Sequence, residues 1–347
     1  FRRVLFRSVE VAAMVRESRD FAEKSPWPDA STATQHVYAE SPSPRPSALV
    51  PQPTREITYS QATHEALSEE MTKNPRIFVM GEGIGVRGGN FKTTDGLFAR
   101  FGAERLCDTP ICERGFVGLA CGAAMTGTRP VIDFMFADFV LDSVGEIVNQ
   151  IAKMQYMSSG RLKMPVLLRG CIGIGHSAAT HHSGSYYAMY AQVPGLRVVV
   201  PSMPADAKGL LKRALNCNDP VLFLEHREIL QVKGPVPDGE YKIDFGRASI
   251  VREGRDVTVV AIARMVHQTL SVCDELEREG ISVEIVDPRT ISPLDTETIL
   301  QSVAKTGRLL IVDEPPAPCG FAAEVAARIR SEEHTSELQS PYVISYA

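Results

Sequence analysis

Apolar segments that alternate with helical segments are the feature that most restricts the fold of this chain. Segments that are apolar along their whole length are typical of strands buried on both faces, as in a parallel sheet. Their alternation with helices predicts an α/β layered domain. The expected strands are 76–81, 129–135, 164–170, 196–202 and 220–226, and the expected helices are 58–73, 114–126, 140–158 and 204–217.

A second α/β unit follows a break in this pattern. The break is QVKGPVPDGEYKID, which is rich in Pro, Gly and charge. Beyond it, the strand-like runs DVTVVAIA, ISVEIVDP and RLLIVDEP alternate with two helical stretches, and GFAAEVAARI starts a third. We therefore expect a domain over 55–230, a linker over 231–245 and a truncated C-terminal domain over 246–329.

The two ends of the chain can be encoded by one short DNA read on opposite strands. FRRVLFRS opens the chain, and RSEEHTSE begins its last 18 residues. We expect residues 1–8 and 330–347 to be adapter-derived and exclude them from reasoning about the fold. Residues 9–39 carry a helical period followed by turns, and residues 40–54 form a Pro/Ser-rich linker.

Composition excludes several classes of protein. The chain has 347 residues, enough for two cores, and its net charge of −5 gives no reason to expect nucleic acid. No apolar run is long enough to span a bilayer, so no membrane partner is expected. The seven cysteines are scattered singly and form no CxxC pair, which predicts neither a zinc site nor a disulfide framework. A reducing, cytoplasmic setting is the expectation.

Three polar or glycine-rich stretches are candidate sites. In TPICERGFVGLACGAAMTG, Glu113 stands where a buried helix begins, and it either caps that helix or faces a cofactor. GEGIGVRGGN, residues 81–90, does not run straight into a helix and is interpreted as a flexible loop and not as a dinucleotide fingerprint. GIGHSAATHHSG holds His176, His181 and His182, which suit acid–base chemistry or anion recognition; solvated loop histidines are the alternative.

Aromatic residues follow the expected strand 129–135. In DFMFADFVLD, core packing is the default interpretation of Phe134, Phe136 and Phe139. A flat heteroaromatic ligand could instead lie against one of these rings.

These segments, taken in order, resemble one family. TPICERG, RPVIDFMFADF, NQIAKMQYMSSG, MPVLLRG, HHS, PGLRVVVPSMPADAKGLL and DPVLFLEH are similar to the β subunit of thiamine-diphosphate-dependent 2-oxoacid dehydrogenases, the E1 components. The resemblance covers about residues 55–329 and implies a transketolase-like pyrimidine-binding domain. FAEKSPWPDASTATQHVYA resembles the end of the matching α subunit, which implies an α–β fusion.

The resemblance assigns roles to single residues. It implies that Glu113 contacts N1′ of the cofactor's aminopyrimidine and promotes its imino tautomer. Phe139 matches the aromatic residue that packs on this ring. His182 matches the active-site histidine near the substrate carboxylate or the lipoyl acceptor, and His181 is an additional candidate. A potassium site made of carbonyl groups is implied at Val166, Ala214, Leu215, Cys217 and Asp219.

The activity implied is oxidative decarboxylation of pyruvate or a branched-chain 2-oxoacid, with acyl transfer to a lipoyl group on E2. Thiamine diphosphate is the implied cofactor, and magnesium would be held by the α part, in an α2β2-like assembly. The alternatives are an acetoin dehydrogenase, a transketolase-like synthase subunit, or an assembly fragment without activity of its own.

Overall fold

The computed structural model describes residues 2–39 and 54–333 and divides the chain into two compact units that meet between Gln35 and His36. The first unit contains helix α1 (Arg2–Lys24) and a 3-10 turn, η1 (Ala30–Thr32). Residues 2–8, predicted to be foreign, form the start of α1. Linker residues 40–53 and tail residues 334–347 lie outside the described residues.

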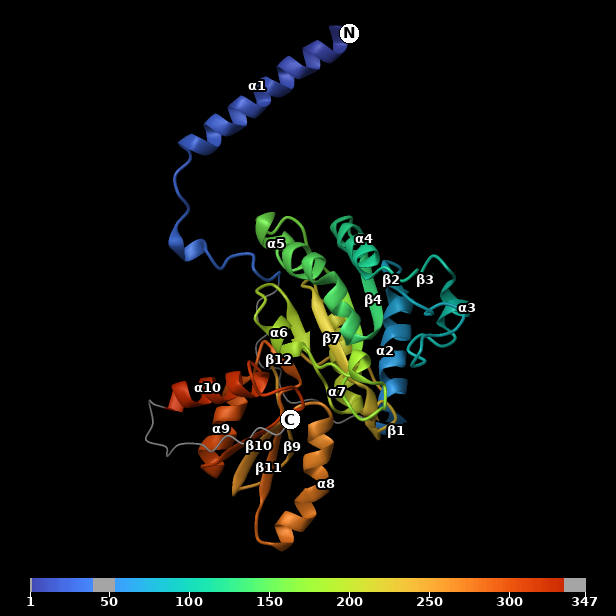
Figure 1. Cartoon of the computed structure of the whole chain (residues 1–347), viewed down its shortest axis with the longest axis vertical. Coiled ribbons are helices and arrows are strands. Elements are labelled where there is room, and N and C mark those ends of the chain that lie inside the picture. The colour runs from blue at the N-terminus through green and yellow to red at the C-terminus, as the bar shows by residue number, and fades with distance from the viewer. Residues whose placement is uncertain (1, 40–53, 334–347) are drawn as a thin grey trace. The chain divides into compact units, whose positions relative to one another are not determined.

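A seven-stranded sheet organises the larger unit (Figure 1). Its strand order is β12-β6-β7-β5-β4-β2-β3, and every neighbouring pair is parallel except β12 with β6. The predicted parallel sheet is therefore confirmed, and each residue of β5 and β7 is buried. The strands are β2 (Ile77–Gly81), β3 (Leu106–Asp108), β4 (Arg129–Phe136), β5 (Leu167–Ile172), β6 (Arg197–Val199), β7 (Val221–His226) and β12 (Thr290–Ser292).

Helices cover this sheet, and three of the four predicted ones are present as single helices. These are α2 (Tyr59–Lys73), α4 (Glu113–Met125) and α7 (Pro204–Asn216). Thr58 and Gln61 start α2 as a capping box, in which each side chain meets the other's backbone N–H at 3.1 and 2.9 Å. Two short helices are α3 (Leu97–Phe101) and α6 (Tyr187–Ala191).

The single α-helix predicted over 140–158 is wrong. The chain forms a 3-10 segment, η2 (Ala137–Ser143), a π-helical segment, η3 (Glu146–Ile151), and a short α5 (Met154–Met157). The apolar spacing that predicted a helix is kept, because Val140, Ile147 and Ile151 are all buried. The three segments differ in how many residues separate the donor and the acceptor of each backbone hydrogen bond. The spacing of apolar residues does not indicate this separation.

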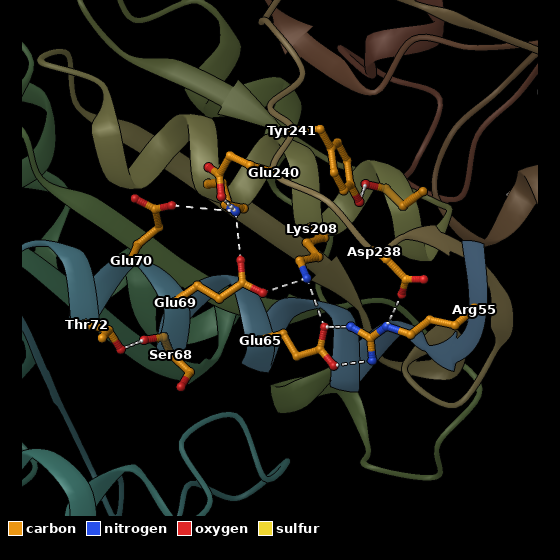
Figure 2. Close-up of polar contacts among 12 residues, drawn as sticks. Arg55, Glu65, Ser68, Glu69, Glu70, Thr72, Lys208, Asp238, Glu240 and Tyr241 are labelled. Atoms are coloured by element: carbon orange, nitrogen blue, oxygen red, sulfur yellow. Dashed lines mark hydrogen bonds and ion pairs between the residues drawn. The ribbon is translucent and has the colours of Figure 1, made fainter. Parts of the chain in front are cut away.

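Helices α2 and α7 are joined by a network of ion pairs (Figure 2). Lys208 contacts Glu65 and Glu69 at 2.9 and 2.8 Å, and Lys212 contacts Glu69 and Glu240 at 2.7 and 2.6 Å. Lys212 also pairs with Glu70 at 3.8 Å. Both lysine side chains are buried, so each ammonium group has left water for two or more carboxylates. Buried charges need such partners, which makes this contact specific to one alignment of the two helices.

The C-terminal residues form a second α/β layer around a four-stranded sheet of order β13-β10-β11-β9, in which only β9 is antiparallel to its neighbour. A two-stranded antiparallel pair joins β1 (Thr54–Thr58), directly before α2, with β8 (Lys233–Pro237), in the predicted linker before the C-terminal domain. Among the described residues, no helix combines the length and apolarity needed to cross a membrane. The C-terminal elements are β9 (Ser249–Arg252), β10 (Val257–Ala261), α8 (Arg264–Arg278), β11 (Val283–Asp287), α9 (Thr296–Thr306), β13 (Leu309–Val312) and α10 (Phe321–Glu333).

Two buried carboxyl groups join the sheets. Ser202 donates a hydrogen bond to Asp287, and Tyr187 donates one to Asp313. Burial raises the pKa of Asp287 to about 7 and that of Asp313 to about 6. The junction between the two domains therefore contains acids that resist ionisation.

Candidate active site

Glu113 is the first residue of α4 and follows the end of β3 by five residues. This position is at the carboxyl edge of the parallel sheet, where α/β folds form their ligand sites. The side chain is 8% exposed, and in the described part of the chain it has no hydrogen-bond or ion-pair partner. It does not cap α4. Its carboxylate oxygens are not among the described polar atoms that are both fully buried and without a partner, so they keep access to solvent and are open to a ligand.

Two further polar groups lie at the same edge of the sheet. Burial raises the pKa of Glu82, and the neighbouring charge of Glu113 raises it further. The hydroxyl of Thr109 is buried, and within the described residues it has no partner either. Glu82 directly follows β2, and Thr109 follows β3. Glu113 is therefore part of a polar group assembled from the segments that follow two neighbouring strands, β2 and β3.

A bulge in β4 positions the aromatic residues. The register between β4 and β5 shifts between Asp133 and Phe136, and Met135 takes a positive φ of 67°, which is unfavourable for a side chain of this size. The buried carboxylate of Asp133 holds the bulge by accepting hydrogen bonds from Met135 N (3.0 Å) and Thr93 Oγ1 (2.8 Å). The chain then enters η2, which carries Phe139 and packs against α4.

His182 and Phe139 are brought together by this turn. The imidazole of His182 stacks on Phe136 with ring centroids 4.4 Å apart, and it meets Phe139 edge-on at 5.4 Å. His181 is exposed, and His176 is directed away to Glu228 at 3.0 Å. The structure thus separates three histidines that the sequence presents as one cluster.

Both ends of the histidine loop are held by carboxylates. Asp138 accepts a hydrogen bond from Gly184 N at 3.1 Å, and Glu314 accepts one from Ile174 N at 2.9 Å. Glu314 also binds the buried His226 at 2.9 Å. Burial is the largest single effect and favours the neutral acid, but the hydrogen bond and charge of His226, the hydrogen bond from Ile174 N and the charge of Arg264 together lower the pKa of Glu314. A cavity of about 550 Å³ lies between this loop and residues 314–320.

Arg227 is a cation that sequence reasoning missed. Its guanidinium lies 4.5 Å from the ring centroid of Phe91 and 5.5 Å from that of Phe136. Among the described residues it makes no ion pair. Phe136 therefore contacts both His182 and a cation. The signal available in the sequence was its place directly after the apolar strand β7, at the same edge of the sheet as Glu82.

Three of the five residues predicted to bind potassium, Leu215, Cys217 and Asp219, already contact arginine side chains. The guanidinium of Arg129 donates to the carbonyl groups of Leu215, at 3.0 Å, and Cys217. The carboxylate of Asp219 is paired with Arg197 at 2.6 Å. These groups fit the guanidinium ions that they hold and do not, as they stand, fit an added alkali cation. Potassium stays a prediction for the set Val166, Ala214, Leu215, Cys217 and Asp219.

Comparison with known proteins defines the class. Residues 55–233 match the family described as "Transketolase, pyrimidine binding domain", and residues 246–346 match "Transketolase, C-terminal domain". The chain belongs to this transketolase-like family, as its resemblance in sequence predicted. Both matches start after residue 54, so the α-like region before the linker stays a prediction.

Curated relatives place the chain among β subunits of oxidoreductases. It is 43% identical to the β subunit of acetoin:2,6-dichlorophenolindophenol oxidoreductase from Cupriavidus necator, over 80% of this chain and 85% of that one. It is also 43% identical to two Bacillus subtilis proteins, the 2-oxoisovalerate dehydrogenase β subunit (82% and 87% covered) and the pyruvate dehydrogenase E1 component β subunit (82% and 88%). A solved split-gene transketolase, in an inactive β4 tetramer, matches with a TM-score of 0.67 and 27% identity over 83% of this chain and 88% of that chain.

Membership of this family implies the use of thiamine diphosphate. The residues present fit its aminopyrimidine ring, because a carboxylate without a partner and an aromatic side chain lie on elements that pack together, α4 and η2. No cluster of three or more His, Cys, Asp or Glu residues suited to a metal occurs within residues 2–39 and 54–333.

Proposed function

We propose that this chain is the pyrimidine-binding half of a 2-oxoacid dehydrogenase E1 component, which decarboxylates pyruvate or a branched-chain 2-oxoacid and passes the acyl group to a lipoyl group on E2. The observation that carries the proposal is Glu113 at the carboxyl edge of the sheet, 8% exposed and without a hydrogen-bond or ion-pair partner in the described structure. Thiamine diphosphate, when bound, supplies the electron sink that decarboxylation requires.

The chain's own residues have separate tasks in this proposal. Glu113 would contact the pyrimidine nitrogen of the cofactor, where its carboxylate would hold the proton that the tautomers of the ring exchange. The pKa of Glu82 is raised, first by burial and then by the neighbouring charge of Glu113. Phe139 packs on the ring. His182 exchanges protons with the substrate or the acyl acceptor, and its stacking on Phe136 fixes the plane of its imidazole.

A second polypeptide region completes the site. Large apolar side chains are exposed on the segments that carry Glu82 and Glu113, namely Val86 (82%), Ile111 (80%) and Leu119 (57%). Apolar side chains gathered beside a candidate site are typical of a surface that another protein covers. We assign this cover to an E1 α region, which would also hold magnesium and the diphosphate, in an α2β2-like assembly. The segment before the linker, residues 9–39, is proposed to be the end of that region.

Potassium takes no part in this proposal, because Arg129 already donates to the carbonyl groups of Leu215 and Cys217, and Arg197 already pairs with the carboxylate of Asp219. A cytoplasmic location is proposed from the seven cysteines, each of which is a free thiol in the structure.

Oxidation of acetoin is the second candidate. It is favoured by the identity with the Cupriavidus necator β subunit, which equals that with the two Bacillus subtilis subunits.

The test pairs this chain with an α half, thiamine diphosphate and magnesium, and compares Glu113→Gln with Glu104→Gln, a change at an exposed glutamate. Carbon dioxide release from pyruvate and from 3-methyl-2-oxobutanoate, and oxidation of acetoin, identify the substrate. We expect Glu113→Gln to lose at least ~100-fold in turnover with an unchanged circular dichroism spectrum, as for removal of an essential proton-transfer group. Near-normal turnover would overturn the assignment of Glu113.

A further inference from the structure

Arg197, at the start of β6, joins three distant parts of the larger unit. Its guanidinium lies 4.8 Å from the ring centroid of Tyr38 and 5.4 Å from that of Phe245, and it pairs with Asp219 at 2.6 Å. Tyr38 precedes the linker 40–53, whereas Phe245 lies in the connection to the C-terminal domain. A buried guanidinium that contacts aromatic rings and a carboxylate is a strong and specific contact.

The backbone next to Tyr38 is also bound. Ala39 N donates to the Oδ1 atom of Asp219 at 2.5 Å, and Gln155 Nε2 donates to the carbonyl of His36 at 3.1 Å. The side chains of Asp219 and Gln155 are both buried in the core of the pyrimidine-binding domain. Two buried polar groups therefore point at the main chain of this segment, which makes the contact a built site and not an accident of exposed side chains.

Two glycines leave room for the segment. A Cβ atom on Gly160 would lie 2.5 Å from Nδ1 of His36, closer than real Cβ contacts come. A Cβ atom on Gly195 would lie 3.3 Å from the carbonyl oxygen of Val37 and 2.1 Å from that of Ala152. The surface is thus shaped for close approach by the main chain of His36–Ala39.

We propose that Gln155, Gly160, Arg197 and Asp219 form a docking surface for the segment His36–Ala39 of the same chain. This contact, in addition to the covalent linker, attaches the region before residue 36 to the pyrimidine-binding domain. Arg197 is the central contact, because it holds Tyr38 by its face and orients Asp219 toward Ala39 N.

Docking changes what the Pro/Ser linker does. If the segment were not docked, residues 36–53 would together act as the linker and set how far the preceding region can move from the domain. With the segment docked, both ends of residues 40–53 are attached to the same compact unit, and the preceding region is attached through the docked segment His36–Ala39. The effective concentration of that region at the domain then depends on the docked residues and not on linker length. The inference rests on the proposed function only in calling the preceding region α-like.

Amide hydrogen exchange tests the contact in the full chain. Peptides spanning residues 35–40 are followed by mass spectrometry in the wild type, Tyr38→Ala and Arg197→Lys. Tyr38→Phe keeps the ring, and Trp27→Ala removes another exposed aromatic, 96% exposed, from the same region. Tyr38 is itself 37% exposed, so its replacement leaves the core intact. Arg197→Lys keeps the charge but loses the planar face and the two-pronged hydrogen bonding.

We expect about tenfold slower exchange than in an unstructured peptide for the wild type, Tyr38→Phe and Trp27→Ala, and loss of this protection in Tyr38→Ala and Arg197→Lys. Free-peptide exchange in the wild type would overturn the proposal, as would full protection in Tyr38→Ala. Protection that rises with protein concentration would assign the docked segment to a second copy and overturn the intrachain contact. None of these readings uses enzyme activity, so they are independent of the proposed function.

Discussion

Arg129 shows how one side chain can replace a metal ion at a turn. The carbonyl groups after α7 converge as they would around a cation, yet in this chain they accept hydrogen bonds from a guanidinium. Each carbonyl oxygen has two lone pairs and could accept a second partner. Potassium would stabilise the turn only if its charge added to the interaction that the guanidinium already makes with these oxygens. The geometry indicates that the positive charge is already supplied.

The prediction is that potassium does not stabilise the wild-type protein. Replacing potassium chloride with choline chloride should leave its melting temperature unchanged. The guanidinium of Arg129 is part of the chain, so the positive charge that it supplies does not depend on the salt. Arg129→Met should lower the free energy of unfolding by about 1–3 kcal/mol, the cost of leaving buried carbonyl groups without donors. Arg255→Met, at an exposed arginine, is the control. A rise of several degrees with millimolar potassium in the wild type would show instead that the cation binds.

The two adjacent histidines give a matched pair of variants. His182→Asn should lower turnover by ~100-fold, because it removes the imidazole that Phe136 and Phe139 position. His181→Asn should change turnover less than about twofold, since His181 is exposed and a surface substitution away from the site has little effect. Steady-state kinetics with the paired α half measures both. Equal losses in the two variants would contradict the assignment of His182.

At the scale of elements, α2 and α7 are held together by charge as well as by apolar packing. Four carboxylates, Glu65, Glu69, Glu70 and Glu240, share the buried ammonium groups of Lys208 and Lys212 (Figure 2). For Glu240, burial favours the neutral form, but hydrogen bonds from Lys212 and Lys73 outweigh it and lower its pKa to about 2. Carboxylates with a lowered pKa stabilise the fold above pH 4.5, and the effect is lost as pH falls toward their folded pKa.

Lys212→Met should therefore make the protein less sensitive to acid while lowering its stability at pH 7. The side chains of Glu69 and Glu240 are each more than one-third exposed, so water can solvate them once Lys212 is gone, which keeps the cost near 1–2 kcal/mol. Urea denaturation at pH 3.5, 5 and 7 measures both effects. An unchanged slope of stability against pH below 5 would show that the network contributes nothing to acid sensitivity.

How far the elements could be predicted depended on burial. Strands β2, β4 and β7 were predicted because both of their faces are buried, so that apolar residues run without interruption. Strands β3, β9 and β12 were missed because they are three or four residues long and mix polar with apolar side chains. The spacing of apolar residues shows which face of a helix or strand is buried. It does not identify a short edge strand or show where such a strand begins and ends.

The candidate site shows the same limit. The sequence predicted Glu113, Phe139 and His182 through resemblance to a family, and their elements do pack together. It did not predict that Glu82 approaches Glu113, because GEGIGVRGGN was interpreted as a flexible loop. That loop is folded by backbone hydrogen bonds such as Gly89 N to Gly83 O, at 2.9 Å, and by Asp108, which accepts from Gly85 N at 2.9 Å. Contacts of this kind depend on the path of the chain, which composition does not encode.

For the whole molecule, the two α/β domains meet through polar groups that titrate near neutral pH. Asp287, completely buried, contacts Ser202 of the pyrimidine-binding domain, and the ion pair of Arg289 with Asp206, at 2.7 Å, lies beside it. Burial, and then the charge of Asp206, raise the pKa of Asp287 from its ordinary 3.8 to about 7. The folded protein therefore binds this proton more tightly than the unfolded chain does.

Stability should fall as pH rises through this interval. A raised carboxyl pKa gives a contribution that is complete below about pH 4 and is lost by pH 7, and a shift of this size corresponds to roughly 4 kcal/mol at most. Asp287→Asn cannot ionise, so its free energy of unfolding should vary less between pH 5 and 8 than that of the wild type. Asn retains an oxygen that can accept the hydrogen bond from Arg289 N, now 2.8 Å from Asp287, so the variant should still fold.

Urea denaturation at pH 5, 6, 7 and 8 measures the difference. Asp274→Asn, at an exposed aspartate on α8, should run parallel to the wild type, since its carboxylate is accessible to water. Parallel profiles for Asp287→Asn and the wild type would mean that Asp287 ionises at no cost where it is buried. In that case water or a rearranged Arg289 would have to reach the carboxylate, and the contact between the two domains would be more open than the packing around Ser202 and Asp287 indicates.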